Sequence, residues 1–123
     1  MSFYVTLQAK EADFKTGDLK AEFAKAYRLR GEWEVGIISC HTNASSTIFW
    51  VFSDIVDFTY VNNTPMQLMD VLQGEKLQVR KPLYSKVIKK TISSINMQFR
   101  QDPKSDYFSE FTDIACMLHF RKT

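Results

Sequence analysis

With 123 residues, the chain has room for one hydrophobic core but not for two independent ones. Hydrophobic residues make up 45% of it and charged residues 24%, a balance that excludes an intrinsically disordered chain. The formal net charge is only +2 and the Lys and Arg residues are spread along the sequence, so binding to nucleic acid through its phosphates is not expected. We therefore predict one folded domain that spans residues 1–123.

Six segments have the alternating or continuous apolar pattern of a β-strand. In chain order they are residues 3–7, 32–37, 47–53, 55–61, 95–100 and 114–121. The run 47–53 is almost wholly apolar, as in a central strand covered on both faces, and Trp33 and Trp50 are expected to fill the core. The aromatic share of 14% agrees with a strand-rich fold, because large rings pack well on a pleated surface.

In residues 55–61, alternation places Val56, Phe58 and Tyr60 on one face of the expected strand. Two other segments, 19–29 and 65–72, fit either a helix or a strand. The first follows Asp18, a residue type that caps helices, and contains several alanines, so the local pattern favours helices there and in 65–72.

Turn sequences rich in Gly, Pro, Asn and Asp separate most of these segments. They occur at residues 15–18, 62–65, 73–75 and 102–105. Short strands at this spacing, without regular intervening helices, predict a β-sandwich or barrel and not a parallel sheet with crossover helices.

No catalytic, cofactor or metal site is expected from the sequence. Cys40 and Cys116 are not in a Cys-x-x-Cys pair, His41 and His119 are not at a metal-ligand spacing, and two free, buried thiols are the favoured interpretation. A disulfide between the cysteines would need close Cα atoms, which a sequence does not reveal.

The chain begins with no signal peptide and contains no apolar run long enough to span a membrane, so we expect synthesis in the cytosol and no membrane partner. The run 86–90 holds three lysines. Its favoured interpretation is a solvated strand edge, where Lys discourages unwanted strand pairing, and the alternative is contact with nucleic acid.

Several motifs resemble a conserved protein of Polinton (Maverick) elements and adintovirus-like viruses. The most specific is Gly31-Glu32-Trp33-Glu34-Val35-Gly36, and the others are residues 3–7, 52–57, 82–84 and 91–95 and the closing Leu118-His119-Phe120-Arg121-Lys122. The resemblance runs through the whole chain in order. The chain departs from these relatives in length, in the residues that follow Gly36, and in the turn at 100–104.

The resemblance implies a penton-like minor capsid protein with a single jelly roll of about eight antiparallel strands. It also implies strands at 19–27 and 66–72, a homo-oligomer, expected to be a pentamer, contact with other capsid proteins, and a place in the virion. Assembly would follow synthesis in the host cytoplasm, there or in the nucleus.

Such a protein acts through surface complementarity, so we expect interface residues and no active site. The candidates are aromatic residues and the lysine edge: Tyr84, Lys86, Lys89, Lys90, Tyr107, Phe108 and Phe111. Two other functions remain open. One is a trimeric fibre-like head that binds a host surface. The other is a nucleic-acid-binding sandwich that uses Trp33 or Trp50 with the lysines of 86–90.

Overall fold

The computed structural model describes residues 2–10, 18–42, 48–73, 76–78, 81–100 and 113–123. Every regular element in these ranges is a β-strand. The strands are β1 (Ser2–Lys10), β2 (Asp18–Arg28), β3 (Trp33–Thr42), β4 (Ile48–Ser53), β5 (Thr59–Val61), β6 (Thr64–Met66), β7 (Leu68–Gln73), β8 (Lys76–Gln78), β9 (Ser85–Lys86), β10 (Thr91–Arg100) and β11 (Asp113–Lys122). Over the described ranges, no helix has the length and apolar content needed to cross a membrane.

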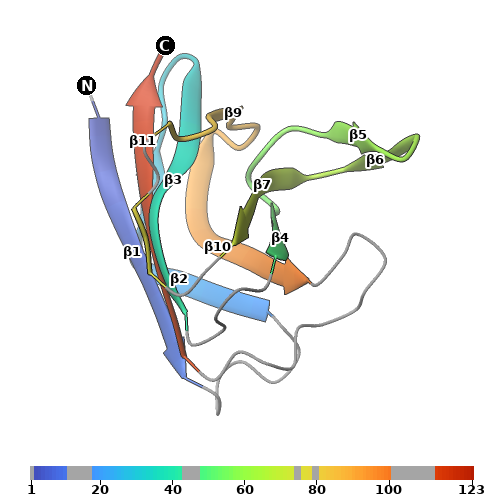
Figure 1. Cartoon of the computed structure of the whole chain (residues 1–123). Helices are drawn as coiled ribbons and strands as arrows, with labels where there is room; N and C mark the ends of the chain where they lie inside the picture. Colours follow the sequence, from blue (N-terminus) through green and yellow to red (C-terminus); the bar gives the residue numbers. More distant parts are fainter. Residues whose placement is uncertain (1, 11–17, 43–47, 74–75, 79–80, 101–112) are drawn as a thin grey trace.

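Two antiparallel sheets face each other, which gives a β-sandwich-like fold (Figure 1). The first sheet has the strand order β1-β11-β3-β8, with β9 also paired to β3. The second has the order β2-β10-β4-β7. A separate ribbon of β5 and β6 projects away from both sheets in Figure 1. The all-β class expected from the sequence is confirmed.

One hydrophobic cluster lies between the two sheets and takes residues from both. In β11 the inward positions are Ile114, Cys116, Leu118 and Phe120, as the alternation of the sequence predicts, and each is at most 2% exposed. β10 repeats the pattern, because Ile92, Ile95, Met97 and Phe99 are all buried.

The helices that local pattern favoured at 19–29 and 65–72 are wrong. Residues Asp18–Arg28 form β2, which pairs with β10, and Leu68–Gln73 form β7, which pairs with β4. Helix propensity differs by only about 0.7 kcal/mol among ordinary residues, so a neighbouring strand that supplies hydrogen bonds and a buried face overrides it.

The strand expected at 55–61 is also wrong in its first half. Ile55 and Val56 are both fully buried but belong to no strand, and Val56 forms only an isolated bridge with Val87. These two residues turn inward and close one end of the core, and the strand begins only at Thr59. Phe58 and Tyr60 do not share a face with Val56 as expected, since both are exposed whereas Val56 is buried.

The two tryptophans differ in how deeply they are buried. Trp33 is 6% exposed and belongs to the core, as expected. Trp50 is only half-buried and pairs across the sheet with Arg100, on the face opposite to the buried Phe49 and Val51. The expectation that β4 is covered on both faces therefore holds only in part, because its outward-facing Ile48 is 50% exposed.

We expect Phe120→Ala to lower the free energy of unfolding by about 3–5 kcal/mol. Phe120 is fully buried and its ring stacks on that of Phe3 in the neighbouring strand, with 4.8 Å between centroids. Urea denaturation measures the change, and Phe120→Leu, which removes fewer atoms, should cost about 1–2 kcal/mol. A loss below 1 kcal/mol for the alanine variant would contradict this core.

Candidate interaction surface

The motif of residues 31–36 and the closing motif of residues 118–122 lie side by side, because β3 pairs with β11. Glu34 is opposite Arg121, Val35 opposite Phe120, and Gly36 opposite His119. Alternation then divides the motifs between two faces. The apolar members, Trp33, Val35, Leu118 and Phe120, point into the core, and the others, Glu34, Gly36, His119 and Arg121, point outward.

Gly31 and Glu32 form the turn that leads into β3. Gly31 has a φ of +86°, in the left-handed region that glycine adopts without a steric cost. The backbone carbonyl of Glu32 accepts a 3.0 Å hydrogen bond from the Thr123 N–H, which ties the end of the chain to this turn. The indole N–H of Trp33 donates to the carbonyl of Arg30 at 2.9 Å and so satisfies its polar atom.

His119 and Arg121, on the outer face of this ladder, pack with Tyr4 of β1 and with Tyr84, which precedes β9. We name these four residues the aromatic cluster. The Tyr84 hydroxyl is hydrogen-bonded to His119 Nδ1 at 2.8 Å. The Arg121 guanidinium lies 3.5 Å from the centroid of the Tyr84 ring and also pairs with Glu34. Tyr4, from β1, stacks on the other side of His119 with 4.6 Å between ring centroids.

Gly36 explains why Tyr84 can lie over the sheet. A β-carbon at this position would be 3.0 Å from the Leu83 carbonyl oxygen and 3.2 Å from the Tyr84 ring. Distances this short force a neighbour to move, so the segment that carries Tyr84 sits directly on the bare backbone of Gly36. His119 Nε2 is buried and has no hydrogen-bond partner among the described residues.

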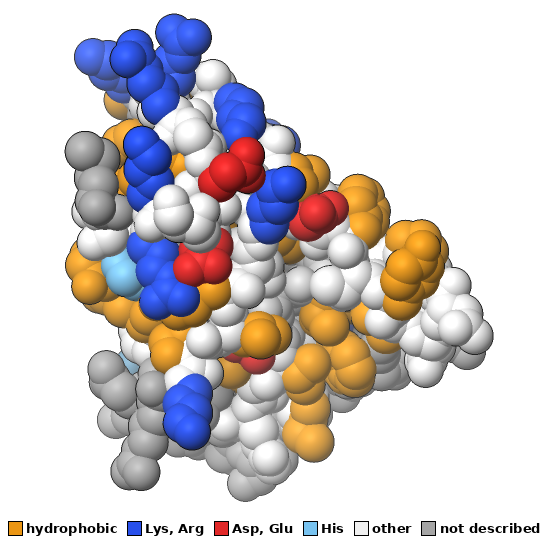
Figure 2. All heavy atoms as spheres, turned by 90° about the horizontal axis from the view of Figure 1, so that it is seen from above, with side chains coloured by type: hydrophobic (Ala, Val, Ile, Leu, Met, Phe, Trp, Pro, Cys, Tyr) orange, Lys and Arg blue, Asp and Glu red, His pale blue; other side chains and the backbone are white. Residues whose placement is uncertain are grey.

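The three lysines of the 86–90 run all approach carboxylates. Lys86 and Lys90 each lie 3.8 Å from a carboxylate oxygen of Glu32, and Lys89 lies 3.0 Å from Asp54. These pairs are solvent-exposed, so each contributes at most about 1 kcal/mol. In Figure 2, acidic side chains lie between some of the Lys and Arg side chains on the face shown. The run is therefore not a purely cationic surface.

Three of the expected interface residues, Tyr107, Phe108 and Phe111, lie outside the described residues. The structure places both Tyr84 and Lys86 beside β3. The Tyr84 ring lies over Gly36, and Lys86, in β9, is opposite Glu34. Lys89 belongs to a different group of contacts, centred on Asp54.

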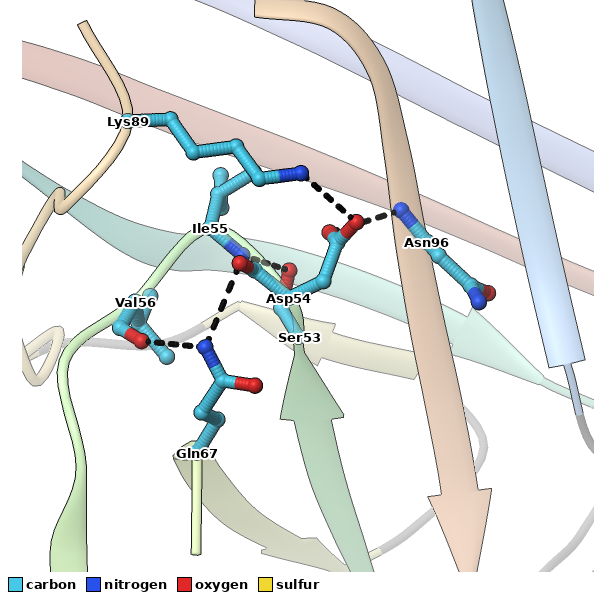
Figure 3. Close-up of polar contacts among 7 residues, drawn as sticks. All are labelled: Ser53, Asp54, Ile55, Val56, Gln67, Lys89 and Asn96. Carbon is cyan, nitrogen blue, oxygen red and sulfur yellow. Dashed lines mark hydrogen bonds and ion pairs between the residues drawn. The ribbon is translucent and has the colours of Figure 1, made fainter.

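The Asp54 carboxylate joins three parts of the chain (Figure 3). It accepts a 3.0 Å hydrogen bond from the Asn96 N–H of β10 and another of 3.0 Å from the Lys89 ammonium. The Asp54 N–H in turn donates to the Asn96 carbonyl at 3.2 Å. Asp54 thereby continues the pairing of β4 with β10 beyond the last residue of β4.

Gln67 holds the same segment, residues 54–56, through backbone carbonyls. Its amide nitrogen donates to the carbonyls of Asp54 and Val56, at 3.2 and 2.9 Å. Residues 54–56 lead into the β5–β6 ribbon and Gln67 leads out of it. A single side chain therefore clamps the two legs of this ribbon together where they leave the sandwich.

We name residues 59–66 the hairpin arm. Its turn is formed by Asn62 and Asn63, with φ values of 50° and 66°. Two successive left-handed residues give the tight hairpin turn whose twist matches that of its strands, and Asn tolerates this conformation. Tyr60 on the arm is 81% exposed, and Phe58 at its base is 56% exposed. In Figure 2, hydrophobic side chains gather on the side of the molecule from which the arm projects.

A hollow of about 240 Å³ lies between the base of the arm and the outer face of β10. Its lining combines amides and a guanidinium with apolar groups, among them Phe52, Met66, Gln67, Asn96, Gln98 and Arg100. The Arg100 guanidinium lies 5.0 Å from the Phe52 ring centroid. The hollow thus exposes both hydrogen-bonding and apolar groups. Across the described residues, no three His, Cys, Asp or Glu side chains are grouped to hold a metal ion.

Sequence reasoning missed the arm, Gln67 and Asn96. The Asn62-Asn63 pair between short runs of alternating residues is a hairpin signal, and it could have identified the arm. Nothing in the local sequence marks Gln67 or Asn96. Gln67 bonds to backbone carbonyls and Asn96 takes part through its own backbone groups, and folding alone brings these partners close.

We expect Gly36→Ala to lower the free energy of unfolding by about 1–3 kcal/mol, the usual cost of overpacking. The added methyl group would displace Tyr84 and Leu83. In a double-mutant cycle with Tyr84→Ala, measured by urea denaturation, the cost of Gly36→Ala should fall, because the ring that it displaces is gone. Equal stability of Gly36→Ala and the parent would refute the close contact.

We expect Gln67→Ala to speed amide hydrogen exchange in the hairpin arm and to reduce stability by about 1–3 kcal/mol, since two hydrogen bonds are lost. Exchange measured by mass spectrometry or NMR checks this, and Gln8→Ala, at an exposed position of β1, is the matched control. Exchange in residues 59–66 that does not change would show that Gln67 is not the clamp.

Comparison of the chain with protein-family models, curated proteins and solved structures gave no match. Its function must therefore be inferred from the fold and from the surfaces described above.

Proposed function

We propose that the chain is a virion structural protein, a jelly-roll subunit that assembles with copies of itself into a ring at capsid vertices. The proposal joins the resemblance of the sequence to penton-like proteins of Polinton and adintovirus-like elements with two features of the structure. These are the order of the strands and the hairpin arm.

The order of the strands supports a jelly roll. In an eight-stranded jelly roll the chain pairs in nested fashion, first strand with last, second with seventh, third with sixth and fourth with fifth. Here β1 pairs with β11, β2 with β10, β3 with β8 and β9, and β4 with β7. Two short strands on β3 take the place of one sixth strand, and the hairpin arm is an addition between the fourth and fifth strands.

The exposed hairpin arm is the observation that carries the assembly proposal. A two-stranded ribbon alone is marginally stable in water, and this one belongs to neither sheet. It nevertheless presents Tyr60 almost fully to solvent, and Tyr is enriched in the buried part of protein interfaces. An arm of this kind gains stability when it packs against another subunit.

The clamp at the base of the arm adds a geometric reason. A ring closes only if each subunit meets the next through the same head-to-tail contact at a fixed rotation. Gln67 and Asp54 tie both legs of the arm to the sandwich, and this fixes the direction in which the arm leaves the subunit. A contact made by the arm can therefore repeat with the same angle in every copy, as a pentamer requires.

A second candidate function is a fibre-like head that binds a host surface, and the hollow beside the arm favours it. Its amides, Arg100 and the apolar wall of Met66 offer both hydrogen bonds and packing to a ligand. The number of subunits separates the two proposals, because a fibre head is expected to be a trimer. Nucleic-acid binding through Trp33 or Trp50 has less support. Trp33 is buried, Trp50 is only half-exposed, and the lysines of 86–90 are paired with carboxylates.

We expect the purified chain to form a closed oligomer, and Tyr60→Ser to weaken its association by about ten-fold or more, since interface hot spots contribute about 2 kcal/mol or more. Light scattering coupled to size-exclusion chromatography measures the mass over a concentration series. Ile48→Ser is the matched control, because Ile48 is also exposed but lies at the far end of β4 from the arm. A chain that stays monomeric at every concentration, alone and with capsid proteins, would overturn the proposal.

A further inference from the structure

The two cysteines, 76 positions apart in sequence, lie next to each other in the core. Cys40 on β3 and Cys116 on β11 are direct cross-strand partners, and their sulfur atoms are 3.0 Å apart. Both are free thiols and each is only 1% exposed. Neither thiol takes part in the surfaces described above.

We propose that Cys40 and Cys116 are the site of a reversible cross-strand disulfide that locks β3 to β11. The backbone already meets the geometric requirement. Directly opposed residues of an antiparallel pair have Cα atoms about 4.5–5.5 Å apart, which lies inside the range of about 4.4–6.8 Å found in disulfides. The sulfurs need to approach by about 1 Å to reach bonding distance, a movement that side-chain rotation can supply.

Oxidation requires an acceptor of two electrons, and a small disulfide such as oxidised glutathione serves. One cysteine, as its thiolate, attacks the small disulfide, forms a mixed disulfide and releases one glutathione thiolate. The second cysteine thiolate attacks the protein sulfur of that mixed disulfide and releases the other. The two thiol protons pass to the released thiolates, so two glutathione thiols form for each protein disulfide.

Burial makes this exchange slow in both directions. The hydrogen bond to Cys40, and then burial, raise the pKa of the Cys116 thiol well above its ordinary value, so the reactive thiolate is scarce. β11 lies between β1 and β3, and an oxidant therefore reaches the pair only when the sheet opens locally. The thiols stay reduced where small thiols are in excess, and a disulfide formed outside such a compartment resists reduction.

The bond would stabilise each subunit without changing its surface. It cross-links residues far apart in sequence, and closing a long loop removes conformational entropy from the unfolded chain. This lock goes beyond the proposed assembly function and does not depend on it, since both cysteines lie within one subunit.

The test uses the reduced full-length chain, incubated with oxidised glutathione with and without a sub-denaturing concentration of urea. Free thiols are then alkylated in denaturant, and non-reducing digestion with mass spectrometry detects a linked peptide that contains Cys40 and Cys116. We expect this peptide to form, faster in urea, and to raise the melting temperature by about 10 °C, with reversal by dithiothreitol. Cys40→Ala and Cys116→Ala should show neither change.

Three results would overturn the proposal. Both thiols could remain alkylatable after long incubation in sub-denaturing urea. The disulfides formed could join different subunits. The linked chain could melt at or below the temperature of the reduced chain, which would show that the bond strains β3 and β11. The peptide analysis of the unsubstituted chain decides the first two even if the alanine variants fail to fold.

Discussion

The antiparallel ladder between β3 and β11 determines which side chains of the two main motifs enter the core and which lie on the outer surface. Because side chains alternate along a strand, a single register places Val35 and Phe120 in the core and Gly36 and His119 on the outer face. A shift of one residue in this part of the ladder would exchange its two faces. Beyond a one-residue irregularity in the register, the same two strands set Cys40 opposite Cys116. On the near side of it, the bare backbone of Gly36 leaves the space in which Tyr84 rests.

The hairpin arm relies more on polar contacts than on apolar burial. The hairpin arm shares no sheet with the sandwich, and its position depends on Asp54, Gln67 and Asn96, which bond mainly to backbone groups. Such bonds each contribute about 1 kcal/mol, far less than the burial of the core side chains. A few hydrogen bonds thus hold the arm in one direction while contributing little free energy to its stability. This suits an element that gains its remaining stability from a partner.

The fold class could be predicted from the sequence, because alternation in 3–7, 95–100 and 114–121 is strong enough to identify strands and their inward faces. Residues 19–29 and 65–72 could not be assigned in this way. Their local preferences are weak, and they are strands because β10 and β4 lie beside them. Ile55 and Val56 show the same limit, since their inward turn follows from the contact with Val87 and not from their own pattern.

The amino-acid pattern alone defines which side chains are apolar, which positions of the most regular strands point inward, and where the chain can turn, as at Asn62 and Asn63. Folding then selects which strands are neighbours. It therefore also decides that Tyr84 meets His119, that Gln67 clamps the arm, and that two distant thiols touch. The physical reason is that periodicity is a property of one segment, whereas pairing depends on two segments that only the folded chain brings together.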